Sequence, residues 1–248
     1  MNRRAMTPIR HLGPTPKSAA EWIESIQRSK FLDLDIDSYN VGEAVQLLEQ
    51  KTANVLDKPS ALFFPKGMTA QFAMLKASEK IAKNSNVILH PLSHLSWDEQ
   101  DAYDKLLNLN AILIGSNRAP LNRAELDTIK TKAATLMLEL PLRRAGFRLL
   151  PWQELLTISD WCKEHNVHCH MDGARLWEST VFYDQPEAQI AALFDTVYVS
   201  FYKGLGAMGG AILAGEEAFI NECRIWRSRL AGDQFIAFPQ LLLSLIHI

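Results

Sequence analysis

The stretch HCHMDGARLWES, residues 168 to 179, gathers chemically active side chains at the end of an apolar run. In a strand, His168, His170 and Asp172 point to the same face of the sheet, because side chains alternate with period two. Two histidines with this spacing can bind zinc or iron. A strand buried on both faces also often contains a hydrogen-bonded histidine, and a polar strand end can form the wall of a cofactor pocket. Locally, these three interpretations stay open.

A second group of this kind is SFYKGLGAMGG, residues 200 to 210. Lys203 directly follows an apolar run, and a buried lysine loses its charge easily and becomes a nucleophilic amine. The glycines after it let a backbone approach closely. The structural alternative is a lysine that extends from the sheet edge into solvent.

The third group is FFPKGMTAQFAML, residues 63 to 75, where a strand-like pair leads through Pro-Lys-Gly into a helix. Free backbone N–H groups at such a helix start can receive a phosphate. The alternative is a tight turn in which Thr69 caps the helix.

The elements that must position these groups alternate along the chain. Helices are predicted at 41–56, 69–82, 124–133, 151–165 and 216–230, and strands at 86–90, 110–115, 135–140, 166–172, 195–201 and 209–215. This order predicts an α/β fold, a mostly parallel sheet with helices on both faces. Ligands of such sheets bind at the carboxyl ends of the strands.

Together, the three groups match the requirements of pyridoxal 5'-phosphate. Its phosphate needs a helix start, its aldehyde needs a lysine for a Schiff base, and its ring nitrogen needs a carboxylate that keeps it protonated. We therefore expect pyridoxal phosphate as the cofactor and no metal.

HMDGARLWES and SFYKGLGAMGG resemble the cofactor motifs of the threonine aldolase and β-eliminating lyase family, which are fold-type I pyridoxal-phosphate enzymes. The resemblance runs from about 37–49 to about 225–232. It implies the fold-type I transferase-like architecture, with a small C-terminal domain that this chain lacks. It also implies an amino-acid substrate and a homodimer or homotetramer.

The resemblance assigns roles position by position. Lys203 matches the Schiff-base lysine, and Asp172 matches the partner of the pyridine nitrogen. Arg175 matches an arginine that holds the substrate carboxylate. His94 matches the histidine that stacks on the cofactor ring, and it is also expected to relay a proton. Glu139 matches an acidic residue at a strand end, and it receives no role.

Phosphate binding falls to the start of the helix at 69–82. Gly67 and Met68 match the Gly-Thr pair that cradles phosphate in the family. Here the order is Gly-Met-Thr, so the backbone donors remain and the hydroxyl moves to Thr69.

This chain departs from the family at several positions. Threonine aldolases commonly follow the strand-end acid with Asn-Thr-His, whereas Leu140 and Leu142 stand here in ELPLRRAGF. The missing histidine puts threonine itself in doubt. Tyr202 precedes the lysine where the family usually has serine, with Ser200 two positions earlier. Ser228 replaces a lysine common in the family.

The function that follows is cleavage of the Cα–Cβ bond of a β-hydroxy amino acid to glycine and an aldehyde. β-Elimination, transamination and racemisation use the same lysine and aspartate, so they remain alternatives. A third alternative is an inactive fragment, because LLLSLIHI at 241–248 ends the chain in an apolar run.

Overall composition fits this interpretation. The 248 residues are 48% hydrophobic and 22% charged, with a net charge of −2, which favours neither nucleic acid nor membrane as a partner. Three cysteines without metal-type spacing indicate a reducing cytoplasm. The expected organisation is a partly flexible segment at 1–36, basic at its start as in transit peptides, a cofactor domain at 37–232 and the start of a truncated part at 233–248.

Overall fold

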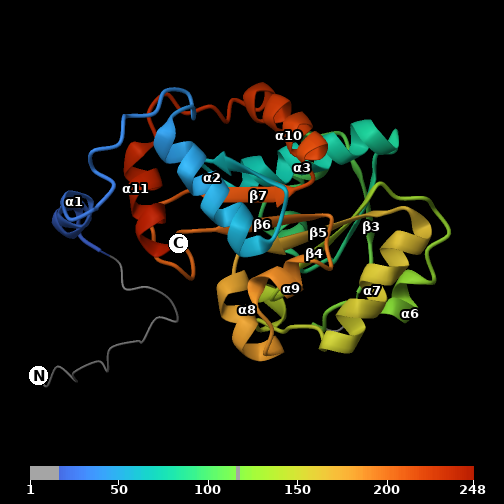
Figure 1. The fold of residues 1–248 in the computed structure, drawn as a ribbon. Helices are drawn as coiled ribbons and strands as arrows, with labels where there is room; N and C mark the ends of the chain where they lie inside the picture. Colours follow the sequence, from blue (N-terminus) through green and yellow to red (C-terminus); the bar gives the residue numbers. More distant parts are fainter. Residues whose placement is uncertain (1–16, 116–117) are drawn as a thin grey trace, which may run out of the picture.

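A mostly parallel sheet forms the centre of the protein in the computed structural model, which describes residues 17–115 and 118–248 (Figure 1). The described residues form seven strands in the order β1-β7-β6-β5-β4-β2-β3. Only β7 runs antiparallel to its neighbours, β1 and β6. The strands are β1 Ser60–Phe64, β2 Asn86–Leu89, β3 Asn110–Leu113, β4 Thr135–Glu139, β5 His168–Gly173, β6 Thr196–Ser200 and β7 Ala211–Gly215.

Helices cover both faces of the sheet, as predicted (Figure 1). α3 and α10 pack on one face, and α2, α7, α8 and α9 pack on the other. The helices are α1 Ala19–Gln27, α2 Glu43–Leu56, α3 Gly67–Ala82, α4 His94–Trp97, α5 Ala102–Lys105, α6 Arg123–Leu126, η1 Arg143–Ala145, α7 Trp152–His165, α8 Leu176–Tyr183, α9 Glu187–Ala191, α10 Glu217–Arg229 and α11 Phe238–His247.

The polar side chains of β5 all face the α3 and α10 layer. Cys169 and Met171 belong to the core on the opposite face, so the alternating residues point the other way. His168 stacks on Phe219 of α10, with ring centroids 4.4 Å apart. The expected common face of the two histidines and Asp172 is therefore present.

One predicted helix is wrong in length. The pattern at 124–133 predicts ten helical residues, but α6 ends at Leu126. Asn122 and Glu125 form a capping box that starts the helix. Thr128 Oγ1 then donates to the Glu125 carbonyl at 2.6 Å, and Thr128, Ile129 and Thr131 are β-branched residues with low helix propensity.

The apolar end of the chain is packed. α11 buries Leu241, Leu242, Leu243 and Leu245 and contacts α1 and α2. Both carboxylate oxygens of Asp37 accept from Ala237 N at 3.0 Å. Residues 1–16, which carry the basic start of the chain, lie outside the described residues. Among the described helices, none combines the length and apolar character of a membrane span.

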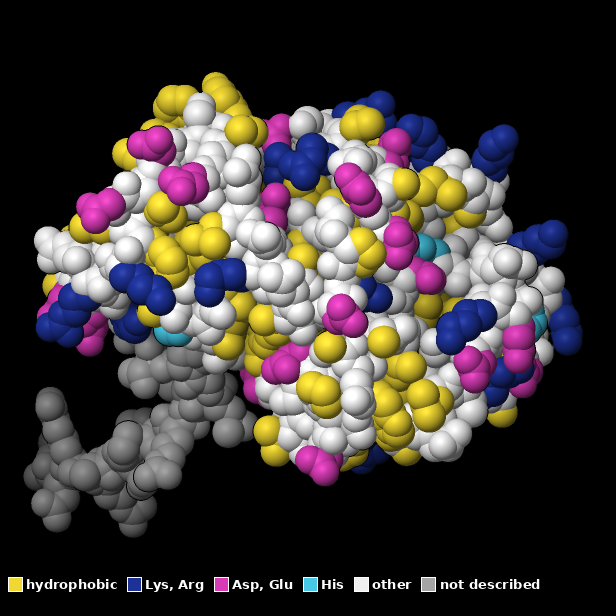
Figure 2. Space-filling model, viewed as in Figure 1, with side chains coloured by type: hydrophobic (Ala, Val, Ile, Leu, Met, Phe, Trp, Pro, Cys, Tyr) yellow, Lys and Arg dark blue, Asp and Glu magenta, His cyan; other side chains and the backbone are white. Residues whose placement is uncertain are grey.

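Figure 2 shows both basic and acidic side chains on one face, among polar and apolar ones, with basic side chains gathered at its right edge and lower left. This view agrees with the small net charge of −2.

Candidate active site

Four of the predicted site residues line one cavity at the carboxyl ends of the strands. His94 begins α4 after β2, Asp172 ends β5, Arg175 precedes α8, and Lys203 follows β6. Glu139, at the end of β4, also lines this cavity. The space between their side chains is about 20 Å³, so an aromatic ring enters only as the flexible side chains move apart.

Asp172 is the buried centre of this group, with 4% of its surface exposed. Its Oδ1 accepts from Ala174 N at 3.2 Å. Burial raises the pKa of the Asp172 carboxyl, while the nearby charges of Lys203 and His94 act in the opposite direction. A carboxylate in this setting favours a cationic partner, such as a protonated ring nitrogen.

The two cationic side chains beside Asp172 have few competing partners. Lys203 is half-buried, and its Nζ lies 5.7 Å from the centre of the Tyr202 ring. The guanidinium of Arg175 lies 5.2 Å from the centre of the Phe147 ring and makes a 3.4 Å contact with Glu178. A contact of this length is weak, so the planar fork of Arg175 stays available for a substrate carboxylate.

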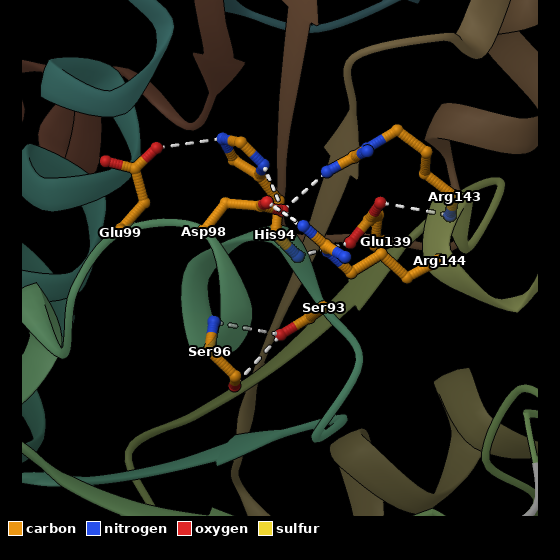
Figure 3. Close-up of polar contacts among 8 residues, drawn as sticks. All are labelled: Ser93, His94, Ser96, Asp98, Glu99, Glu139, Arg143 and Arg144. Atoms are coloured by element: carbon orange, nitrogen blue, oxygen red, sulfur yellow. Dashed lines mark hydrogen bonds and ion pairs between the residues drawn. The ribbon is translucent and has the colours of Figure 1, made fainter.

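His94 is held at both edges of its ring (Figure 3). Its Nδ1 lies 3.1 Å from Asp98 Oδ2, and its Nε2 lies 2.9 Å from Glu99 Oε1. Asp98 also pairs with Arg143 and Arg144, and the guanidinium of Arg144 holds the pKa of Asp98 well below its usual range. A ring held at its edges keeps its flat face free for stacking.

Glu139 connects two walls of the cavity (Figure 3). Its Oε2 accepts from the backbone N–H of His94 at 2.6 Å, and its Oε1 accepts from that of Arg143 at 3.1 Å. Glu139 is also the direct neighbour of Asp172 across the β4–β5 pair. Burial and this second carboxylate raise the pKa of Glu139 to about 7.

The raised pKa of Glu139 predicts a pH dependence of stability. Between about pH 4.5 and pH 7 the folded protein binds more protons at this site than the unfolded chain does. The free energy of unfolding therefore falls as pH rises through this interval. Glu139→Gln lacks this carboxyl, so its free energy of unfolding should rise relative to that of the wild type by on the order of 3 kcal/mol between pH 4.5 and pH 7. Thermal unfolding of both proteins across this pH range is the measurement. The same change of stability with pH in the two proteins would contradict the prediction.

The predicted phosphate cradle lies at the start of α3, next to the cavity wall. A Cβ on Gly67 would lie 2.0 Å from the Tyr198 hydroxyl, so only glycine fits there. The side chain of Met68 packs into the core beneath α3, and only its backbone can contribute. The methyl group of Thr69 faces Gly232. These three residues do not line the cavity around Asp172.

Leu140 and Leu142 replace polar residues of the family, and only Leu140 lines the candidate site. Leu140 and Pro141 line the cavity with Asp172 and Lys203. Leu142 does not: its side chain is buried and lines a neighbouring cavity with Leu150. The prediction for Leu142 is therefore wrong, because η1 begins directly after it and turns the chain.

The histidines of β5 are engaged by neighbouring polar groups. His168 Nε2 and His170 Nδ1 both lie 2.8 Å from Thr196 Oγ1, and His170 Nε2 lies 2.6 Å from Gln71 Oε1. In residues 17–115 and 118–248, no three His, Cys, Asp or Glu side chains gather as a metal site would require. A larger cavity, about 430 Å³, lies near the start of β5 and contains none of the predicted site residues.

The sequence did not indicate Gln71, Asp98, Glu99 or Arg143 as part of this region. Gln71 on α3 contacts His170 on β5. Asp98 and Glu99 directly follow α4 and contact the His94 ring, and Arg143 donates its backbone N–H to Glu139. Gln71 lies one helical turn after Gly67 in α3, and this position was the one signal in the sequence that placed it near the site.

Comparisons with known proteins identify a family that this chain matches over most of its length. The model of the beta-eliminating lyase family matches residues 27–235. A low-specificity L-threonine aldolase of Candida albicans is 27% identical over 202 residues, which are 78% of this chain and 54% of that protein. An alanine racemase of Cochliobolus carbonum is 39% identical over 88 residues, 36% of this chain and 23% of that protein.

Among solved structures, a candidate L-allo-threonine aldolase of Listeria monocytogenes superimposes with a TM-score of 0.91 at 38% identity. The match covers 95% of this chain and 65% of that one. The chain thus spans between half and two thirds of the length of these two aldolase relatives. The chain belongs to the beta-eliminating lyase family, whose fold-type I members use pyridoxal phosphate.

Proposed function

We propose that the protein is a pyridoxal-phosphate-dependent lyase that cleaves β-hydroxy amino acids to glycine and an aldehyde. The observation that supports it most is the meeting of Asp172, Lys203, Arg175 and His94 in one cavity at the carboxyl ends of three strands, β2, β5 and β6. The aldolase names of the Candida albicans and Listeria monocytogenes relatives favour carbon–carbon cleavage.

The residues present fit this cofactor. A buried carboxylate at Asp172 suits a protonated ring nitrogen, and the Lys203 amine lies close enough to lower the pKa of that carboxyl. The start of α3 has no side-chain cap and no side chain at Gly67, which leaves backbone donors for a phosphate. When bound, the cofactor supplies an electron sink for the carbanion left after bond cleavage.

The other side chains bind and orient the substrate in this proposal. Arg175 binds the substrate carboxylate. His94 takes the proton of the β-hydroxyl through Nε2 once this nitrogen leaves Glu99 Oε1, or a water beside the ring takes it, and the Asp98 carboxylate stabilises the charged ring that results. Glu139 fixes the backbone of both the His94 and the Arg143 segments.

Product analysis tests the reaction type. The full-length protein, loaded with pyridoxal phosphate, is incubated separately with L-threonine, L-allo-threonine, L-serine and L-cysteine. Glycine with acetaldehyde from either threonine epimer supports the proposal. Pyruvate from serine or cysteine, without aldehyde from threonine, would assign β-elimination instead.

Racemisation is the second candidate, because of the segment similar to the Cochliobolus carbonum alanine racemase. Lysine and aspartate at the positions of Lys203 and Asp172 serve that reaction as well. Conversion of L-alanine to D-alanine, measured by chiral chromatography, separates it from cleavage. D-alanine formation without aldehyde release from threonine would replace the lyase proposal.

Substrate preference is expected to be broad at the β-carbon. Leu140 and Pro141 give the cavity an apolar wall that cannot hydrogen-bond the substrate hydroxyl. We expect little discrimination between threonine and allo-threonine, and a preference for bulky apolar β-substituents, at about 1 kcal/mol or more for each added methylene. The measurement is kcat/KM for threonine, allo-threonine and β-phenylserine. A clear preference for threonine would contradict this role of the wall.

A further inference from the structure

A continuous line of buried polar side chains runs behind Asp172. Thr196 Oγ1 lies 2.8 Å from His170 Nδ1, and His170 Nε2 lies 2.6 Å from Gln71 Oε1. All three side chains are at most 1% exposed. Gln71 belongs to α3, whereas His170 precedes Asp172 by two residues on the same face of β5. The line therefore joins α3 to β5 and β6, and it includes His170, two residues before the carboxylate at the strand end.

The hydrogens along this line are constrained. Burial lowers the pKa of both His168 and His170, so each ring is neutral and has one donor and one acceptor nitrogen. Thr196 has a single hydroxyl hydrogen. If His168 donates to Thr196, Thr196 donates to His170, and His170 then donates from Nε2 to Gln71 Oε1.

The side-chain amide of Gln71 has two possible orientations, with either Oε1 or Nε2 toward His170, and the surroundings of Nε2 decide between them. Gln71 Nε2 is buried and has no hydrogen-bond partner among the described residues. Its Oε1 contacts His170, two residues before Asp172 on the same face of β5, and the Gln71 amide also acts to lower the pKa of the Asp172 carboxyl. Turning the amide over would place Oε1 against the Asp172 carboxylate, and two acceptors would then repel each other. The orientation with Nε2 toward Asp172 is the favourable one.

We propose that Gln71 is a positioning residue: His170 and Thr196 hold its amide so that it donates to Asp172 and keeps that carboxylate charged for the cofactor's ring nitrogen. The naming of the cofactor rests on the proposed function. The contacts among Gln71, His170 and Thr196 do not depend on it. In this proposal Gln71 acts on the reaction only through the Asp172 carboxylate.

Other ionisable groups face Asp172 and contribute to its titration. Glu139 lies beside it on β4, and Tyr198 lies beside it on β6. Lys203 and His94 lower the pKa of Asp172, and burial raises it by more than they lower it. Because burial already dominates, loss of the Gln71 amide should leave the carboxyl protonated to a higher pH.

The test is the titration of Asp172 in the protein without cofactor, followed through its carboxyl carbon by NMR. Gln71→Met keeps the length of the side chain and removes the donor. We expect its titration midpoint to rise by about one pH unit or more, a tenfold change in the ionisation equilibrium. The acid limb of kcat/KM should move upward with it. Gln153→Met, at an exposed position of α7, is the matched control and should leave both unchanged.

A folded Gln71→Met protein whose Asp172 midpoint stays within about 0.3 of the wild type, on the order of the precision of such titrations, would overturn the proposal. If that variant fails to fold, the wild type decides, because the side-chain amide nitrogen of Gln71 should shift as Asp172 titrates. An amide resonance that does not follow the titration also overturns it.

The outcomes for the positioning role and for the proposed function are separable. A shifted midpoint in a protein that binds no pyridoxal phosphate supports the positioning role and removes the cofactor assignment. Cofactor binding with an unshifted midpoint supports the cofactor assignment and removes the positioning role.

Discussion

Replacing Lys203 with alanine is expected to abolish the covalent link between the protein and pyridoxal phosphate. Lys203 is the one lysine among the described residues on the wall of the cavity around Asp172, so its amine is placed to reach the cofactor's aldehyde. The wild type should show visible absorbance after loading, and the variant should not. Borohydride reduction and peptide mapping should place the label on Lys203.

The control for this experiment is Lys163→Ala. Lys163 lies on α7 with most of its side chain exposed and its Nζ 3.3 Å from Asp160. That variant should keep the absorbance and the label of the wild type. A label on another lysine, such as Lys66 before α3, would show that the assignment of Lys203 is wrong.

The second large effect is expected from Asp172→Asn. An amide cannot hold the ring nitrogen protonated, so the carbanion loses its electron sink while the other cofactor contacts remain. We expect bound cofactor and a loss of activity of at least about 10²-fold, the scale of removing one preorganised electrostatic partner. Cofactor content by absorbance and turnover with the best substrate are the two measurements.

Asp195→Asn is the matched control for this change. Asp195 lies at the opposite end of the same strands, where its Oδ2 accepts from Cys169 N at 2.7 Å. It should lower stability slightly and leave turnover per bound cofactor unchanged. Turnover near that of the wild type in Asp172→Asn would remove Asp172 from the mechanism.

The fold was predictable where one local pattern decides the structure. The apolar strands with β-branched residues and the helix periodicity of α2, α3 and α7 depend on neighbours in sequence. The short α8 and α9 were not predicted, because Leu176, Trp177, Val181 and Phe182 give α8 apolar residues around most of its circumference. A helix of this length has no clear periodicity to detect.

The meeting of the candidate site residues was predictable at the strand ends, whereas the contacts behind them were not. Asp172 and Lys203 stand in motifs, and the rule for parallel sheets brings strand ends together. Gln71 and His170 are 99 positions apart and meet only because α3 crosses β5. The neighbours Glu139 and Asp172 depend on strand register, which a short apolar run does not specify.

The double anchor at Glu139 has a consequence for redesign of the substrate pocket. Because one carboxylate fixes the backbone of both His94 and Arg143, the Pro141–Arg143 segment and the α4 segment form one mechanical unit. Substitutions that widen the pocket at Leu140 or Pro141 should therefore be non-additive with substitutions at His94. Libraries that vary the two segments together should yield altered specificities that successive single-position screens do not find.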